Sequence, residues 1–320
     1  MDSELAPWIE MLQSEDVGDR LVAVKSLQHL GDEEALEPIV LALSDEHASV
    51  QKLAVSALWE MADRAAVQPL IPCLSSPDEE VRTEALGALR ELVSPDDLLV
   101  LLDALHQDDF YMQLNILILL RKIHDVQALP YVLPFFESDR EELREAAIVT
   151  LRYLNQVDNC APALALMNDP APAVRREAVL TLSYLSDAEV VEILNRALAS
   201  DPDWQVRRNA AQSLANLKSP TSIPAAIAAM EDEHWQVRKF AARALQQVVD
   251  DSAIPVLVTA LADEYSDVRR DAAIALGKLG NPTVLNSLKQ TLDDPDADVR
   301  IFSQRAIDAI QAAKTEVTHG

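Results

Sequence analysis

The sequence predicts an all-α protein, an α-solenoid (superhelix) of about ten helical hairpins of 31 residues each. A frame of the form Asp-x-x-x-x-Val-Arg-x-x-Ala-x-x-x-Leu recurs along the whole chain at a nearly constant step. Within each copy the apolar residues follow the spacing of a helix. Only 4% of the 320 residues are aromatic and 6 are glycine, whereas a β-sandwich or barrel normally needs more of both.

The position that valine holds in this frame is the anchor of each repeat. The anchors fall at positions 19, 50, 81, 112, 143, 174, 206, 237, 268 and 299, in steps of 31 residues with one step of 32. A constant period of this length is the signature of a stacked repeat protein. We therefore expect residues 1–320 to form a single repeat array without a separate catalytic domain, and residues 312–320 to form a short flexible tail.

Each repeat is expected to hold two helices. The second helix starts near the anchor, because apolar residues follow at +4, +8 and +11, as Ala85, Leu89 and Leu92 follow Val81. The first helix starts about 17 residues later with a proline in its first turn, where no backbone hydrogen bond is lost. These prolines are Pro38, Pro69, Pro130, Pro224 and Pro255.

Polar residues before the first helices predict N-caps, and two glycines predict helix ends. The expected caps are Asp32, Asp63, Asp125, Thr221 and Asp251. Gly31 and Gly280 stand where a preceding helix should end.

An Asp five residues before the anchor and an Arg directly after it predict ion pairs. The Arg position borders the buried stripe, so its guanidinium can reach the turn Asp of its own repeat or of the next one. Such partly buried pairs would fix the rotation between repeats. The turn positions are Asp45, Asp169, Asp201, Asp232, Asp263 and Asp294, and the arginines are Arg175, Arg207, Arg238, Arg269 and Arg300. A row of active-site carboxylates is disfavoured, because one carboxylate per repeat is typical of stacking contacts.

The charge of the chain narrows the partner classes. With 27 basic and 53 acidic residues its formal charge is −26, which disfavours nucleic acid and anionic membranes as partners. No apolar stretch approaches the length of a membrane span. The start Met-Asp-Ser-Glu-Leu lacks the basic region of a secretory signal, and Cys73 and Cys160 make no disulfide framework. The expected location is the reducing cytoplasm.

The side of the second helix opposite its core stripe is the expected partner-binding groove. Positions +2, +6 and +9 fall there, flanked by +3 and +10. Apolar groups beside Arg and Tyr at these positions are the composition of an interface core. The candidates are Trp59, Leu114, Ile118, Arg121, Val149, Arg152, Tyr153, Leu180 and Tyr184. The same positions also suit ordinary core between repeats, and the sequence leaves both interpretations open.

Nearly all basic residues fall on second helices. The exceptions are Arg64, Arg140, Arg196, Lys218, Lys289 and Lys314. We therefore expect an acidic outer side and a neutral-to-basic groove.

Aromatic residues at −2 from the anchor form a second candidate, at one edge of the stack. These residues are Phe110, Trp204 and Trp235. Either they line an edge-binding site, or each ring folds over its own turn.

No catalytic, cofactor or metal site is predicted. The six histidines show no HxxxH or HExxH spacing, and the two cysteines lie nearly three repeats apart. The chain has no GxSxG, GxGxxG or P-loop motif. His124 is expected to end a helix, and both thiols are expected to be small buried hydrophobes.

The repeat frame with its first-helix proline resembles the HEAT repeat, and more closely the short HEAT-like repeat named after phycobilisome bilin lyases. The repeats of Met112 and Asp19 depart from this pattern. The resemblance implies that the second helices line the concave side, and that the protein is a non-catalytic scaffold holding a helix or extended segment of another protein. That family includes a cyanobacterial protein that interacts with an iron–sulfur scaffold, which suggests a partner from iron–sulfur assembly.

The enzymatic alternative within the same family is a bilin lyase or lyase-like chaperone subunit. It would bind an open-chain tetrapyrrole and a phycobiliprotein. The arginines expected at the propionates are Arg90, Arg121 and Arg152, beside Trp59, Tyr153 and Tyr184.

Overall fold

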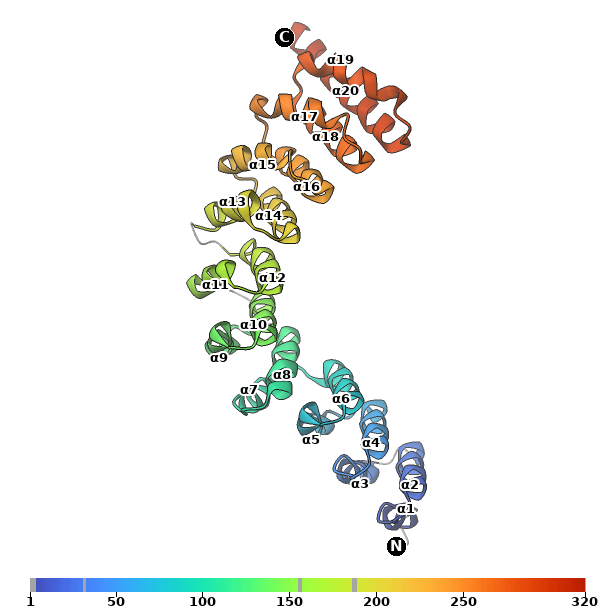
Figure 1. Cartoon of the computed structure of the whole chain (residues 1–320). Helices are drawn as coiled ribbons and strands as arrows, with labels where there is room; N and C mark the ends of the chain where they lie inside the picture. The colour runs from blue at the N-terminus through green and yellow to red at the C-terminus, as the bar shows by residue number, and fades with distance from the viewer. Residues whose placement is uncertain (1–3, 31–32, 155–156, 186–188, 320) are drawn as a thin grey trace. The chain divides into compact units, whose positions relative to one another are not determined.

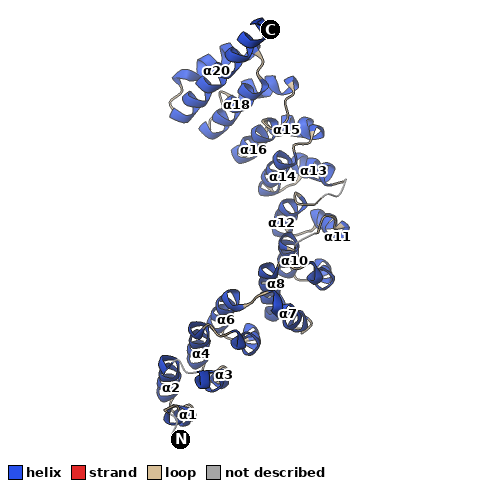
Figure 2. Ribbon diagram, turned by 180° about the vertical axis from the view of Figure 1, so that it is seen from behind, coloured by secondary structure: helices blue, strands red, loops and turns tan. Residues whose placement is uncertain are grey.

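A computed structural model describes residues 4–30, 33–154, 157–185 and 189–319 of the chain (Figure 1). Its described residues form helices and connecting turns, with no strand among them (Figure 2). The predicted all-α class and the helical-repeat architecture are therefore confirmed.

The chain divides into two compact units, Met1–Val157 and Asp158–Gly320, each a stack of helical hairpins. In the first unit the second helices of the hairpins are α2 (Val17–Leu30), α4 (Ala48–Met61), α6 (Glu79–Leu92), α8 (Phe110–Ile123) and α10 (Glu141–Tyr153). The first helices are α1 (Ala6–Met11), α3 (Leu36–Ala42), α5 (Val67–Leu70), α7 (Leu98–Leu105) and α9 (Leu129–Val132).

The second unit repeats this plan. Its first helices are α11 (Ala161–Ala165), α13 (Val190–Ser200), α15 (Ile223–Ala229), α17 (Ile254–Ala260) and α19 (Leu285–Gln290). Its second helices are α12 (Pro172–Leu182), α14 (Trp204–Leu217), α16 (Trp235–Leu245), α18 (Ser266–Leu279) and α20 (Ala297–His319). Within each unit the second helices lie along one side and the first helices along the other (Figures 1 and 2). We call the exposed side of the second helices the second-helix face.

The anchors mark the core, as the helical spacing predicts. Nine of them, from Val50 to Val299, are buried, and so are the +4 and +8 residues that follow Val81. The anchor of the first repeat is the exception, because Asp19 is exposed and the core there is formed by Ala23, Val24 and Leu27.

Prolines shape the first helices more than the sequence pattern suggested. Pro38, Pro69, Pro130, Pro224 and Pro255 lie in the first turns of α3, α5, α9, α15 and α17, as predicted. Two further prolines, Pro72 and Pro134, end α5 and α9 early, and each helix continues as a 3-10 helix, Ile71–Ser75 and Leu133–Glu137. A proline inside a helix lacks the N–H for the i−4 hydrogen bond and clashes with that carbonyl, which tightens the turn.

The caps are confirmed in part. Asp63 and Asp125 accept hydrogen bonds from the N–H groups of Ala65 and Gln127, both at 2.8 Å. Asp251 is wrong as a cap, since Asp250 accepts the bond from Ser252 N. Thr221 is wrong as well, because the N-cap position is Ser219. Within the described residues, a short 3-10 turn precedes seven of the first helices, including α15 and α17, and it moves the cap towards the N-terminus.

Helix ends show the left-handed backbone that the glycine positions predicted. Gly280 follows α18 with φ of 70°. Ala62, His124 and Lys218 adopt the same conformation without being glycine, so His124 does end α8. Gly31 and Asp32 lie outside the described residues. Helix α20 continues to His319, and both the flexible tail and the single array remain predictions.

Two mid-helix glycines should respond in opposite ways to alanine. A Cβ at Gly277 of α18 would lie 2.7 Å from Cβ and 2.9 Å from Cα of Ala306 in α20. We expect Gly277→Ala to destabilise the protein by about 1–3 kcal/mol, because the two helices must separate. A Cβ at Gly87 of α6 meets nothing within 4 Å. Gly87→Ala should therefore stabilise the helix by about 0.5–1 kcal/mol.

Urea unfolding of the two glycine variants and the wild type measures both effects. Stabilisation by Gly277→Ala would contradict the close approach of α18 and α20.

Candidate functional site

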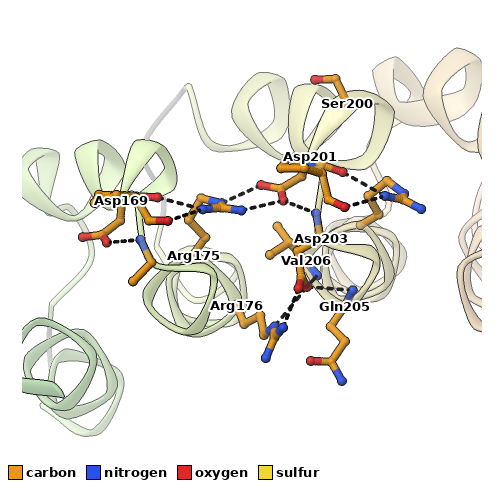
Figure 3. A network of polar contacts seen from close by, with 12 residues as sticks. Asp169, Arg175, Arg176, Ser200, Asp201, Asp203, Gln205 and Val206 are labelled. Atoms are coloured by element: carbon orange, nitrogen blue, oxygen red, sulfur yellow. Dashed lines mark hydrogen bonds and ion pairs between the residues drawn. The ribbon is translucent and has the colours of Figure 1, made fainter. Parts of the chain in front are cut away.

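A ladder of arginine–aspartate pairs joins successive repeats of the second unit. Nε and Nη2 of Arg175 donate to the two carboxylate oxygens of Asp201 at 2.8 and 3.0 Å (Figure 3). Nη1 of the same arginine donates to the backbone carbonyl of Asp169 at 2.8 Å. The predicted ion pair thus forms with the aspartate of the next repeat. The turn of the arginine's own repeat contributes only a backbone carbonyl oxygen as acceptor.

The same arrangement recurs down the stack. The further pairs are Arg207–Asp232, Arg238–Asp263 and Arg269–Asp294, each with an Nε–O distance of 2.7 Å, and the first unit contains Arg20–Asp45 at the same distance. Each turn Asp also accepts a bond from a backbone N–H two residues later, as Asp201 does from Asp203 N at 2.9 Å. One carboxylate therefore closes its own turn and holds the preceding repeat.

The ladder perturbs the ionisation of its members. The bonds from Arg269 hold the pKa of Asp294 below its ordinary value, and the same pairing raises the pKa of Arg269. Arg176, one residue after the ladder position, likewise lowers the pKa of Asp203 through a bidentate contact across the same interface (Figure 3). The cause of these shifts is the pairing between neighbouring repeats.

In the middle of the first unit, other contacts stand in place of the arginine–aspartate ladder. Gln51 and Gln113 stand in place of the arginine and bond the turn carbonyls of Asp45 and Gln107. Across the α6–α8 interface, the Arg82 guanidinium lies 3.8 Å from the ring centroid of Tyr111. The buried Asn115, which departs from the repeat pattern, donates to the carbonyl of Leu74 at 3.1 Å.

The second-helix face of the first unit holds most of the predicted groove residues. Leu114 and Ile118 on α8 and Val149 on α10 are half-buried, and none belongs to the buried core. Tyr153 at the end of α10 is 42% exposed. We define the α8–α10 patch as the six adjacent residues Leu114, Ile118, Arg121, Val149, Arg152 and Tyr153.

Contacts between α8 and α10 hold parts of this patch in place. Arg121 donates to the carbonyl of Ala146 at 3.3 Å and to Thr150 Oγ1 at 3.4 Å. Thr150 Oγ1 in turn donates to the carbonyl of Leu117 at 2.7 Å. The ring of His124 lies 6.2 Å from that of Tyr153. The guanidinium of Arg121 on α8 is therefore held by hydrogen bonds to α10.

Three predicted groove residues lie apart from the patch. Trp59 is 47% exposed on α4, with α6 between it and α8. Leu180 is half-buried on α12 and Tyr184 is exposed just after it, both in the second unit. The binding role of all nine groove residues remains a prediction.

The second unit contains a cleft that the sequence analysis did not single out. Its volume is about 790 Å³, and it opens between side chains of α14, α16, α18 and α20. Two sequence signals were present: Arg243 and Arg270 fall at the groove positions +6 and +2, and Asp271 stands at +3, where other second helices carry uncharged residues or glutamate.

The edge aromatics pack between repeats. Trp204 stacks on His234 of the next repeat with centroids 4.8 Å apart, and Trp235 stacks on Tyr265 at 5.0 Å. Phe110 lies 4.0 Å from the guanidinium carbon of Arg140 in the same way. Each ring at −2 thus contacts the residue at −3 of the following repeat, an arrangement that neither sequence interpretation contained.

The two thiols lie inside the fold, and the basic residues follow the predicted distribution. Both cysteines are buried, and burial raises the pKa of Cys73 to about 11. The basic residues lie on second helices with the predicted exceptions, save that the backbone of Lys314 belongs to α20.

Among the described residues, no group of His, Cys, Asp and Glu side chains is placed to hold a metal ion. In that same part of the chain, no helix combines the length and apolar content needed to cross a bilayer.

Stacked hairpins with paired turns define the class of helical-repeat proteins, in which each repeat is stabilised by its neighbours. The sequence profile of HEAT repeats matches residues 5–90, 37–113, 160–233 and 223–308, which is more than half of the chain. The chain belongs to the HEAT-repeat family. No curated protein matches it.

Two solved structures show the same fold. An engineered protein has a TM-score of 0.56 and 22% identity, with 96% of this chain and 98% of that chain covered. A chain from the structure of Kap95p bound to RanGDP has a TM-score of 0.65 and 13% identity, and the match covers 96% of this chain and 49% of the other. The present chain spans about half of that longer solenoid. At these identities the likeness extends to the fold alone.

Proposed function

We propose that the protein is a non-catalytic scaffold that binds a helix or extended segment of another protein on the α8–α10 patch. The observation that carries this proposal is the composition of the patch: half-buried Leu114, Ile118 and Val149 beside an exposed tyrosine and two arginines. Apolar residues, Tyr and Arg are enriched where protein interfaces form their core. HEAT-repeat solenoids are typical protein-binding scaffolds, which supports the same conclusion.

The patch suits binding energetically. Covering a half-buried aliphatic side chain contributes about 1 kcal/mol before association costs, roughly half the value for a fully exposed one. Arg121 is already held by Ala146 and Thr150, so little further side-chain freedom is lost when a partner packs on it.

The partner and the location are finer parts of the proposal. We place the protein in the cytoplasm and take an iron–sulfur assembly protein as the first partner to test, because the repeat resembles that of a HEAT protein interacting with such a scaffold. The alternative is a bilin-binding, lyase-type role for the same face. Co-expression with bilin biosynthesis separates the two, since a coloured product supports the alternative and a colourless complex with one protein supports the scaffold.

Introducing negative charges into the patch tests the scaffold. We expect Ile118→Asp combined with Val149→Asp to weaken partner capture by at least about tenfold, because two carboxylates would be desolvated in the interface. The matched control is Leu99→Asp, the same chemical change at a residue on α7 that is 78% exposed. The measurement is a pull-down from native lysate with mass spectrometry, followed by titration with the purified partner.

Circular dichroism and melting distinguish a lost interface from a lost fold. Unchanged helicity with lost capture supports the proposal. If the double variant melts far below Leu99→Asp, the residues are core, and if it retains the partner, the patch is not the binding surface.

A further inference from the structure

The cleft of the second unit contains two arginines held by one buried carboxylate. Asp271 on α18 is only 3% exposed, and its two oxygens accept from Nε of Arg243 at 2.7 Å and from Nε of Arg270 at 3.2 Å. Arg270 also contacts Asp267 at 2.6 Å through Nη2. The carboxylate therefore fixes the direction of two guanidinium groups that come from neighbouring repeats.

The side chain of Arg243 lines the cleft. Its side chain is 40% exposed, and its guanidinium lies 5.1 Å from the ring centroid of Phe240. Among the described residues, neither Nη1 nor Nη2 of Arg243 forms a hydrogen bond, and Nη1 of Arg270 forms none. These donors point to a ligand with acceptor oxygens.

Carboxamides surround the two arginines. The cleft lining includes Gln212, Asn216, Gln246 and Gln247 from α14 and α16 and its adjoining turn. Gln246 donates to the backbone carbonyl of Asp271 at 2.9 Å, while the other three form no side-chain hydrogen bond within the described part of the chain. An amide both donates and accepts, which matches the alternating N–H and C=O groups of an extended peptide backbone.

The charge of the cleft favours a single carboxylate over a phosphate chain. Its lining has three cations, Lys218, Arg243 and Arg270, against two carboxylates, Asp271 and Asp298. Asp267, which contacts Arg270, also pairs with Lys239 at 3.0 Å. One positive charge therefore remains, in a chain whose formal charge is −26. A polyphosphate backbone needs many neutralising cations, whereas one carboxylate matches this excess.

We propose that this cleft binds an extended peptide segment through an Asp or Glu side chain, with Arg243 and Arg270 as the carboxylate-binding groups. Asp271 is the positioning residue. The apolar side chains of the lining would pack against the methylene groups of the peptide's Asp or Glu; they are Phe240, Ile274 and Phe302. The inference rests on the proposed scaffold function but uses a surface separate from the α8–α10 patch.

A peptide library tests the proposal directly on the full-length chain. The probe is a set of decapeptides with random flanks and a central Glu, Gln or phosphoserine, together with a single-stranded oligonucleotide of mixed sequence. We expect Glu peptides to be retained about tenfold better than Gln peptides, as charge-assisted hydrogen bonds allow. Equal retention of Glu and Gln, or preference for the oligonucleotide, overturns the proposal.

Arg305 of the second unit provides a matched control for Arg243. Arg305 also stacks on a phenylalanine, Phe302, at 5.1 Å and occupies the same +6 position, but it does not line the cleft. Arg243→Gln should abolish the preference for Glu, and Arg305→Gln should keep it. The reverse result, or loss in both variants with unchanged melting, overturns the assignment.

The role of Asp271 has its own readout. Asp271→Asn removes one negative charge and loosens both guanidinium groups, so we expect the preference to move from Glu towards the doubly charged phosphoserine. An equal fall for both peptides would indicate a merely structural residue and overturn the positioning role. Ile118→Asp combined with Val149→Asp should leave the Glu preference intact, so failure of the α8–α10 patch and failure of this cleft are distinguishable.

Discussion

Replacing Arg238 with Ala is expected to lower the free energy of unfolding by about 3 kcal/mol. The change leaves the carboxylate of Asp263, which is 9% exposed, without the two bonds that Arg238 donates to it. It also removes the bond to the carbonyl of Asp232 at 2.8 Å. Losing one partner of a buried pair is costly because the other charge remains desolvated.

Arg300 provides the control for this experiment. It occupies the same position after its anchor and bonds the carbonyl of Asp294 at 2.6 Å, but within the described residues no carboxylate of a further repeat faces it. We expect Arg300→Ala to cost less than about 1 kcal/mol. Equal losses in urea unfolding would contradict a ladder that acts between repeats.

A double variant separates the charge from the packing. Arg238→Met with Asp263→Asn removes both charges and keeps an oxygen that can accept from Tyr265 N, as Asp263 does at 2.9 Å. It should recover part of the stability lost in Arg238→Ala, because no uncompensated charge stays buried. A double variant as unstable as Arg238→Ala would show that shape, rather than the uncompensated charge, causes the loss.

Asp294→Asn should cost about 2 kcal/mol at pH 7 and nothing in strong acid. The bonds from Arg269 hold the pKa of Asp294 below its ordinary value of 3.8 in the folded protein. A lowered folded pKa means that the carboxylate stabilises the fold fully above the unfolded pKa. That contribution is lost as the pH falls through the folded pKa, in the window below about pH 4.

Urea unfolding of the wild type and Asp294→Asn at pH 7, 5, 4 and 3 measures this difference. The control is Asp308→Asn, an exposed residue of α20 whose carboxylate accepts only from Gln304 within the described chain. Its difference from the wild type should stay small at every pH. A difference for Asp294→Asn that is constant down to pH 3 would contradict the ionic origin of the ladder's stability.

The sequence predicted the elements whose cause is local and periodic. The apolar stripe after Val81, the first-turn Pro38 and the helix end at Gly280 follow from spacing and backbone preference, and the structure has all three. The cap at Asp251 failed because a 3-10 turn precedes α17 and moves the N-cap to Asp250. Such a shift of one residue depends on the packing of the turn, which the pattern of residue types does not encode.

Contacts between repeats needed the three-dimensional structure, because the offset between neighbouring helices selects each partner. The sequence left two partners open for Arg175, and stacking brings its guanidinium to the carboxylate of Asp201 and the carbonyl of Asp169. The same offset places Trp204 over His234 rather than over its own turn.

The sequence by itself determined the repeat, its helices and the positions of the charges, because these follow from a period of 31 residues and the geometry of a single helix. Only the tertiary structure decided which charges meet. Arg243, Arg270 and Asp271 come from two second helices at positions +6, +2 and +3, and no one-repeat pattern joins them. They meet because α16 and α18 pack side by side, and burial of one carboxylate between them holds both arginines.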